Sequence, residues 1–259
     1  MKRNIGVAAL LGLLATGLLA TAATAQCNPP PNYPGMMIKF DQDAWAYETA
    51  YTTSTFSSAV GSQLTVVGIA SVFCTPFLDL DPNDPNTEYT FIWDNLTSLG
   101  TISKPVGASG MQYTTKYLGG GFRLYAGSPR NAPTAAILPS LPAPGVVPDL
   151  YVDGTMILQG VLDTLTTIVT RASNGNYSGS FRANYQCTGG TLYGRVGNGV
   201  NLLSGLWCAV PPNNPDPPYP IGTCVHPAGW SAHPSGKWDT PITVPVKPST
   251  WGTIKTLYR

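Results

Sequence analysis

The clearest alternation of apolar and polar side chains lies between Asp149 and Val196. From position 177, the odd-numbered residues are mostly apolar or aromatic, and the intervening residues are polar: Ser178, Ser180, Arg182, Asn184 and Gln186. Successive side chains of a β-strand point to opposite faces, so this period of two predicts a strand with one buried face and one wet face. Residues 155–161 and 164–170 are rich in β-branched and apolar side chains and predict two more strands. The Asn-Gly pair within Ser173–Asn176 suits a tight hairpin turn between the strand at 164–170 and the strand that begins at residue 177.

Further strands are predicted on both sides of this hairpin. Residues 64–73 are apolar on both faces, which is typical of a central strand covered on each side. Residues 88–93 alternate again, and segments 114–118 and 121–126 predict a pair joined at Gly119 and Gly120. Shorter strands are expected at 36–40, 191–196, 202–207 and near Trp238, whereas residues 41–56 fit either a short helix or a loop.

Composition agrees with an all-β chain. The sequence contains 28 Gly and 25 Pro, which favour turns and disfavour long helices. Charged residues make up 10% of the chain, well below the roughly 25% of ordinary soluble domains, and Thr, Ser, Asn and Gly take their place. We therefore expect an antiparallel β-sandwich with long Pro/Gly-rich loops.

Four regions are expected along the chain. Residues 1–25 have a positive start, an apolar run and a small-x-small site at Ala23–Ala25, which predict a cleaved signal peptide. The β-sandwich is expected over residues 26–210, and a Pro-rich extension over 211–248. Residues 249–259 form a separate tail, and the mature chain contains no further apolar run of the roughly 18 residues that a membrane span needs.

Export bears on the cysteines and on the charge. All five cysteines (Cys27, Cys74, Cys187, Cys208 and Cys224) follow the predicted leader, so disulfides are the expected state in an oxidising compartment. The spacing favours Cys27–Cys74 together with either Cys187–Cys208 or Cys208–Cys224, with one thiol left over. Lys2 and Arg3 leave with the leader, so 12 of the 14 Lys and Arg face 13 acidic residues, and no basic field for nucleic acid is expected.

Several segments in order resemble a known group of proteins. These are EYTFIWDNLTSLGT (88–101), YLGGGFRLYAG (117–127), DGTMILQGVL (153–162), GSFRANYQCTGGTLYGRV (179–196) and PAGWSAHPSGKWD (227–239). The series resembles exported bacterial surface proteins with a variable C-terminal anchor, many of which end in a PEP-CTERM sorting tail. The resemblance implies a β-sandwich at the cell surface or in the extracellular matrix, with no established activity.

The C-terminus departs from that group, because it has no Pro-Glu-Pro, no membrane-spanning run and no terminal Arg cluster. It resembles instead the short Trp-Gly-x-Ile-Lys-x-Leu-Tyr-Arg tails of other exported proteins. Trp251, Ile254 and Tyr258 would share one face of a short helix, so an export or anchoring machine is the expected partner of residues 249–259.

One cluster of oxygen ligands stands out. Asp79, Asp81 and Asn83 have the spacing of the first three ligands of an EF-hand loop, and Asp84 and Glu88 follow closely. The EF-hand pattern then fails, because Asp84 stands where Gly belongs and Thr90 where the bidentate Glu belongs. The loop therefore predicts either a Ca²⁺ site or, as the preferred interpretation, a polar turn between two strands.

Other candidate chemistry is sparse. Cys224, His226 and His233 lack a fourth ligand for structural zinc, and nothing places a carboxylate beside either histidine for a hydrolytic triad. Aromatic side chains near loops and strand ends, namely Trp45, Tyr47, Trp230 and Trp238, could stack on sugar rings, although packing under long loops is the alternative for each.

These observations favour a secreted, non-catalytic structural or adhesive protein of the cell surface or matrix. Its expected partner is a surface glycan or matrix component, with no nucleic acid and no cofactor except Ca²⁺ at the acidic loop. A carbohydrate-binding module is the second interpretation, and a secreted hydrolase is the third.

Overall fold

The computed structural model describes residues 35–134, 147–173, 177–196, 199–209 and 230–239. The predicted signal peptide and C-terminal tail lie outside these residues. Strands dominate the described chain, and helical turns are short: β1 Met36–Glu48, β2 Tyr51–Thr52, η1 Thr53–Thr55, β3 Ser57–Ser58, β4 Val60–Phe73, β5 Glu88–Val106, β6 Gly110–Leu118, β7 Gly121–Gly127, η3 Val147–Tyr151, β8 Thr155–Leu162, β9 Thr164–Arg171, β10 Tyr177–Gly189, α1 Tyr193–Val196, β11 Val200–Cys208 and β12 His233–Asp239. None of the helices in this part of the chain is long and apolar enough to cross a membrane.

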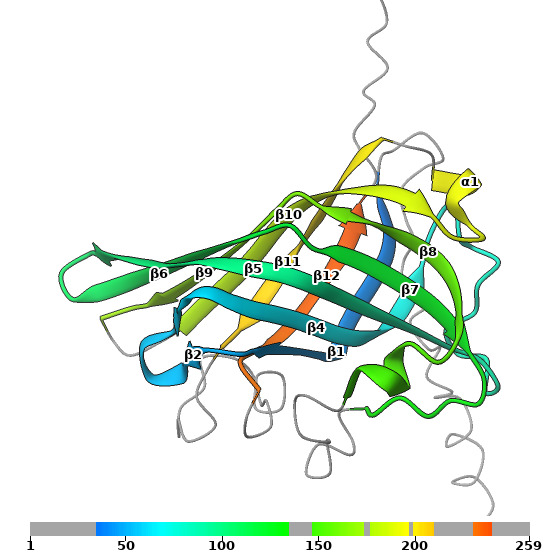
Figure 1. Cartoon of the computed structure of the whole chain (residues 1–259), viewed down its shortest axis with the longest axis horizontal. Coiled ribbons are helices and arrows are strands. Elements are labelled where there is room, and N and C mark those ends of the chain that lie inside the picture. Colours follow the sequence, from blue (N-terminus) through cyan, green and yellow to red (C-terminus); the bar gives the residue numbers. More distant parts are fainter. Residues whose placement is uncertain (1–34, 135–146, 174–176, 197–198, 210–229, 240–259) are drawn as a thin grey trace, which may run out of the picture.

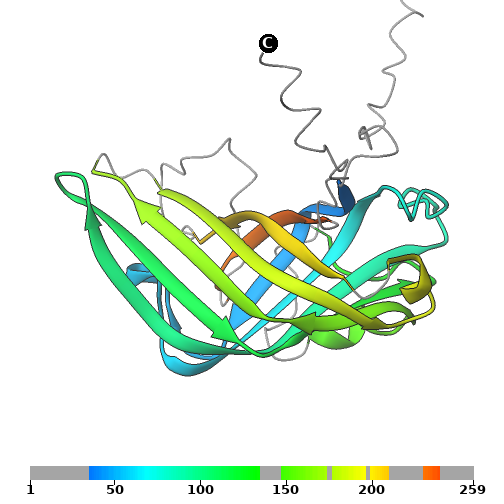
Figure 2. The same ribbon diagram turned by 90° about the horizontal axis from the view of Figure 1, so that it is seen from above.

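The main sheet is antiparallel and closes on itself (Figures 1 and 2). The long strand β5 pairs with β7 through residues 88–94 and with β6 through residues 97–106. Strand β10 likewise pairs with β9 through residues 177–182 and with β8 through residues 185–189. Two pairs of strands therefore connect β5 to β10: β6 and β9 in one half of the barrel, and β7 and β8 in the other half. With β11, β12, β1 and β4 the circuit forms an eight-stranded barrel.

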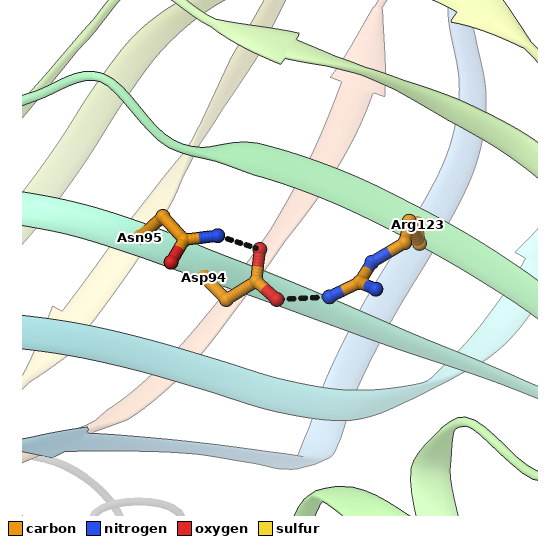
Figure 3. A network of polar contacts seen from close by, with 3 residues as sticks. All are labelled: Asp94, Asn95 and Arg123. Carbon is orange, nitrogen blue, oxygen red and sulfur yellow. Dashed lines mark hydrogen bonds and ion pairs between the residues drawn. The ribbon is translucent and has the colours of Figure 1, made fainter.

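Polar groups hold the point at which β5 changes partner. The Asp94 carboxylate accepts hydrogen bonds from the Arg123 guanidinium of β7 and from the Asn95 amide, the latter at 3.3 Å (Figure 3). Asn95 has a positive φ of 57°, and the nearby Gly120 has a φ of 91°. A Cβ atom at Gly120 would lie 2.7 Å from the Asp94 carbonyl oxygen, so only glycine allows the β6–β7 turn to pass this close.

Large aromatic side chains fill the barrel interior. Phe40 and Phe91 pack against the Trp238 ring with centroid distances of 5.1 and 5.0 Å, and Phe181 lies 5.6 Å from Trp93. Glycines on the neighbouring strands make the room. A Cβ atom at Gly205 or Gly236 would lie 2.8 or 2.6 Å from the Phe181 ring. Small and large residues therefore interlock across the barrel, as dense packing requires.

A second apolar cluster lies outside the barrel, on one side only. It contains Trp45, Val67, Ile69, Ile92, Tyr125, Ala132, Tyr151 and Trp230. The loop with η3 covers β4 and β5, where Thr90 Oγ1 donates to the Tyr151 carbonyl at 2.8 Å. The segment before β12 covers β1, because Ala46 N donates to the Ala232 carbonyl at 2.9 Å. Strand β4 is thus covered on both faces, as its apolar sequence predicts.

The structure confirms an antiparallel all-β fold but corrects the expected sandwich, because one sheet closes into a barrel instead of two open sheets packing face to face. The short edge strand expected at 36–40 is the start of the 13-residue strand β1, which lies between β12 and β4. The strand expected at 191–196 is the helical turn α1. Strand β12 lies inside the expected Pro-rich extension, so the β domain does not end at residue 210.

Candidate functional site

The aromatic side chains expected to hold sugar rings are buried. Trp45, Trp230 and Trp238 are 0%, 5% and 1% exposed, and Tyr47 is half-buried. Trp238 lies in the barrel interior, whereas the other three belong to the covered outer cluster. The expectation that the three indole rings are exposed is therefore wrong: the barrel encloses Trp238, and the outer cluster buries Trp45 and Trp230. The three buried indoles stabilise the fold, and a ligand contact at Tyr47 stays a prediction.

His233, one of the two histidines, is also part of this packing. It begins β12, is buried, and stacks on the Trp45 indole at a centroid distance of 4.8 Å and an angle of 20°. The Asp153 carboxylate, which a hydrolase could use, accepts a hydrogen bond of 2.8 Å from the Asn131 amide. His226 and Cys224 lie outside the described residues, so the zinc and hydrolase interpretations gain no geometry from this part of the chain.

The carboxylates of the acidic loop bind its own backbone and neighbouring residues. Asp81 Oδ1 accepts from Asn83 N at 2.9 Å, and Asp84 Oδ1 accepts from Asn86 N at 2.9 Å. The hydrogen bonds from the Asn86 amide and the Thr87 hydroxyl lower the pKa of the Asp84 carboxyl, and the Arg195 guanidinium lowers the pKa of Asp79 in an exposed ion pair.

Glu88 turns away from this loop, and both of its carboxylate oxygens accept from Ala132 N at 3.1–3.2 Å. Burial raises the pKa of Glu88, although the backbone amides of Asn131 and Ala132 oppose that shift. Across the described segments no group of three or more His, Cys, Asp or Glu is placed to hold a metal ion. Ca²⁺ binding at Asp79, Asp81, Asn83, Asp84 and Glu88 stays a prediction.

A buried polar cluster closes one end of β1. Glu48, 5% exposed, accepts hydrogen bonds from the Ser58 hydroxyl and, at 3.0 Å, from the Tyr117 hydroxyl. Ser58 Oγ lies 2.6 Å from Ser98 Oγ. Desolvation by burial raises the pKa of Glu48, and the hydroxyl donors oppose that shift. These hydrogen bonds join β1, β3, β5 and β6. Because every member of the cluster is buried, a substrate has no access to it.

The cysteines differ in state. Cys74 and Cys208 are disulfide-bonded, and Cys187 is a buried free thiol whose pKa burial raises to about 12. The alternative bridge Cys187–Cys208 is therefore wrong. The bridges Cys27–Cys74 and Cys208–Cys224 involve residues outside the described ranges, so this pairing stays a prediction.

On the other side of the barrel, none of the described loops covers a broad outer face. We call it the open wall: the outward side chains of β6, β9, β10, β11 and β12 and of the first part of β1. Register aligns six of them in one continuous row across six strands. This cation row consists of Lys116, Thr166, Arg182, Ser204, Lys237 and Lys39. Cations and hydroxyls thus lie side by side on a surface that the described loops do not cover.

Two shallow hollows lie along the cation row. The first, of about 340 Å³, lies between β9 and β10 and is lined by Thr166, Ile168, Arg182 and Asn184, among others. The second, of about 300 Å³, lies over β1, β11 and β12 and is lined by side chains that include Lys39, Ser204, Leu206 and Lys237. Both are open to solvent, so they suit an extended ligand lying on the surface better than an enclosed small molecule.

The cations of the cation row differ in whether they have an ion-pair partner. Arg123 is held by Asp94 (Figure 3), and Arg195 by Asp79. On the wall, Lys39 and Lys237 pair with Asp41 and Asp239 at 2.8 and 3.0 Å, which are exposed or partly exposed contacts. Within the row, Lys116 and Arg182 have no ion-pair partner among the described residues, and outside the row the same holds for Lys104, Arg130 and Arg171. An anionic ligand would therefore meet two free cations and two weakly engaged ones.

The sequence contains part of this site. The wet face Ser178–Gln186 of β10 follows from its alternation, and the structure confirms it. The local sequence around Lys39, Lys116 and Lys237 does not predict that they belong to the site, because only the register of distant strands aligns them with Arg182.

Fold and site together define a closed antiparallel barrel with a packed interior, one covered side and one open polar wall. No protein-family model, curated protein or solved structure matches the chain.

Proposed function

We propose that this protein is exported and acts without catalysis at the cell surface or in the extracellular matrix. It attaches to surface material through the open wall. The observation that carries this proposal is the one-sided covering of the barrel: loops cover β4 and the adjoining parts of β1 and β5, while the wall stays open with its polar and cationic side chains. The resemblance to exported surface proteins and the predicted leader supply the location.

The side chains of the wall suit attachment. They include hydroxyls, an amide and cations, with Ile168 and Leu206 between them, and they are held by a rigid sheet. Strands lie about 4.8 Å apart, so the six-stranded row extends over roughly 24 Å. A surface of this breadth fits a polymer better than a small substrate.

Retention on native surface material tests the proposal. Purified mature protein is added to washed cells and extracellular matrix of the producing strain, and the bound fraction is measured. We expect saturable binding that a Leu206→Glu substitution weakens, because the substitution removes an apolar contact and adds a carboxylate that competes with the ligand for Lys39 and Lys237 in the second hollow. Leu206 is 52% exposed.

Val161→Glu is the matched control. Val161 is 49% exposed on the outer face of β8, outside the wall. Absence of binding, or equal weakening by both substitutions, would contradict attachment through the wall.

A further inference from the structure

We infer that the ligand of the open wall is a linear acidic polysaccharide with a carboxylate on every second sugar, bound along the cation row. This inference rests on the proposed function and names the class of its ligand. It uses the six-residue row, the two hollows and the state of each cation.

The spacing of the cations carries the first step. Thr166 separates Lys116 from Arg182, and Ser204 separates Arg182 from Lys237. With strands about 4.8 Å apart, each of these cation pairs is separated by roughly 10 Å along the row. That interval matches the repeat of an extended chain of two-sugar units. Lys116, Arg182 and Lys237 would each meet one carboxylate, and the hydroxyls of Thr166 and Ser204 between them would meet the uncharged sugars. Lys39 pairs directly with Lys237 and would meet the same carboxylate as Lys237.

A second row supports the same ligand. A second set of side chains is aligned by register in the same way: Ile102, Thr114, Ile168, Ser180, Leu206 and Ser235. On the five strands that the two rows share, these residues lie two positions from the cation row. The second row alternates apolar and hydroxyl side chains. A sugar ring presents an apolar C–H face and polar edges, so the alternation suits a polymer that lies along both rows. Ile102 and Leu206 are largely exposed and available for such contacts.

The low density of cations on the wall favours this polysaccharide over nucleic acid as the ligand. DNA carries a phosphate about every 3.4 Å along each strand, and proteins that bind it place many cations against that backbone. The wall has four cations in a row of six residues, and the predicted mature chain has 12 Lys and Arg against 13 acidic residues.

The curvature of the wall favours a flexible polymer over a lipid membrane as the ligand. The wall is the outer, convex face of a barrel (Figure 2), and a flat lipid surface would touch only part of the row. A flexible polymer can follow the curve from β6 to β1.

The test measures binding of hyaluronan decasaccharides, which carry a carboxylate on every second sugar, to the mature full-length protein by calorimetry. We expect binding that weakens with added salt and disappears with the carboxyl-reduced oligosaccharide. The double substitution Lys116→Ser, Arg182→Ser should weaken binding about tenfold or more, since it removes both cations of the row that have no ion-pair partner among the described residues.

Arg171→Ser is the matched control. Arg171 is exposed at the end of β9, in the same hairpin as Arg182 but outside the row. It removes one positive charge and should leave the affinity within about twofold. Circular dichroism melts of all variants verify that the barrel is intact.

Several results would overturn the inference. These are no binding of hyaluronan, binding that survives carboxyl reduction, equal loss in the Arg171→Ser control, or tighter binding to duplex DNA or to vesicles of anionic phospholipid. If native surface material binds in a Leu206-dependent manner while hyaluronan does not, the proposed function stands and only the ligand class fails. If neither binds, both fail.

Discussion

Two buried tyrosines, Tyr117 and Tyr185, differ in whether their hydroxyl groups have a hydrogen-bond partner. The Tyr117 hydroxyl donates to Glu48 at 3.0 Å, whereas the Tyr185 hydroxyl has no partner within the described ranges. Tyr117→Phe leaves a buried carboxylate oxygen without its donor and should cost about 1–3 kcal/mol of unfolding free energy. Tyr185→Phe removes an unsatisfied group and should be neutral or stabilising by up to about 1 kcal/mol. Urea denaturation measures both, and equal losses would contradict this account of the barrel.

Glu48 should make stability depend on pH in a direction opposite to the usual one for a carboxyl. Burial raises its folded-state pKa above the ordinary 4.5, so the folded protein binds the proton more tightly than the unfolded chain. The stabilisation that this provides is fully present below about pH 4.5 and is lost as the pH rises through the raised pKa.

The Glu48→Gln variant isolates this contribution. We expect the difference in unfolding free energy between wild type and variant to move in favour of the variant as the pH rises from 4 to 7. Glu88→Gln should show the same direction, because burial also raises the pKa of Glu88. A difference that does not change with pH would exclude Glu48 as a titrating group in this range.

Thiol counting tests the states of the cysteines. Cys187 is free and buried, with a pKa raised to about 12, so it should resist alkylation in the folded protein at pH 8. After denaturation without reductant, mass spectrometry of the mature chain should find one alkylated site, at Cys187. Three or more modified cysteines would contradict the prediction of two disulfides.

At the scale of elements, local alternation predicts well where one face of a strand is wet. Strands β8, β9 and β10 follow from the sequence with nearly correct bounds, because their outer faces carry Thr, Ser, Arg and Asn. Strand β1 is missed beyond Phe40. Its second half is covered outside by Trp230 and inside by the core, so Ala44–Tyr47 shows no alternation. Residues 191–196 include the strand-forming residues Thr, Tyr and Val, yet residues 193–196 fold as a helical turn at one end of the barrel.

The candidate site shows the same limit at longer range. The polar side of β10 can be predicted from its alternation, but the cation row depends on pairings that join β1, β10 and β12. The aromatic residues failed as predictions for a related reason. Trp45 and Trp230 are buried where loops fold back over β1 and β4, and no pattern near either residue predicts that cover. Trp238 is buried by closure of the barrel.

For the whole molecule, closure replaces the expected sandwich. A sandwich leaves edge strands with unpaired backbone groups, whereas each strand of this barrel circuit has a neighbour on both sides. Closure depends on two long strands that change partner halfway, and on β12, which comes late in the chain and pairs with both β1 and β11. Nothing in the local sequence of β12 specifies these partners.

The dependence on β12 gives a prediction for two truncations. A chain ending at residue 229 lacks β12, so it exposes the edges of β1 and β11 and removes Trp238, which packs against Phe40 and Phe91. Losing the indole alone, in Trp238→Ala, should cost about 3–5 kcal/mol. Losing the whole strand should abolish the cooperative thermal transition.

A chain ending at residue 248 lacks only the predicted tail, and its melting temperature should match that of the full chain. If residues 249–259 are an address for export or anchoring, the retention of this shorter chain at the cell surface should change instead. A melting temperature lowered by several degrees, with localisation intact, would mean that the tail belongs to the barrel. Because the two truncations differ by 19 residues that include β12, their comparison separates a strand that closes the barrel from a segment that directs the protein.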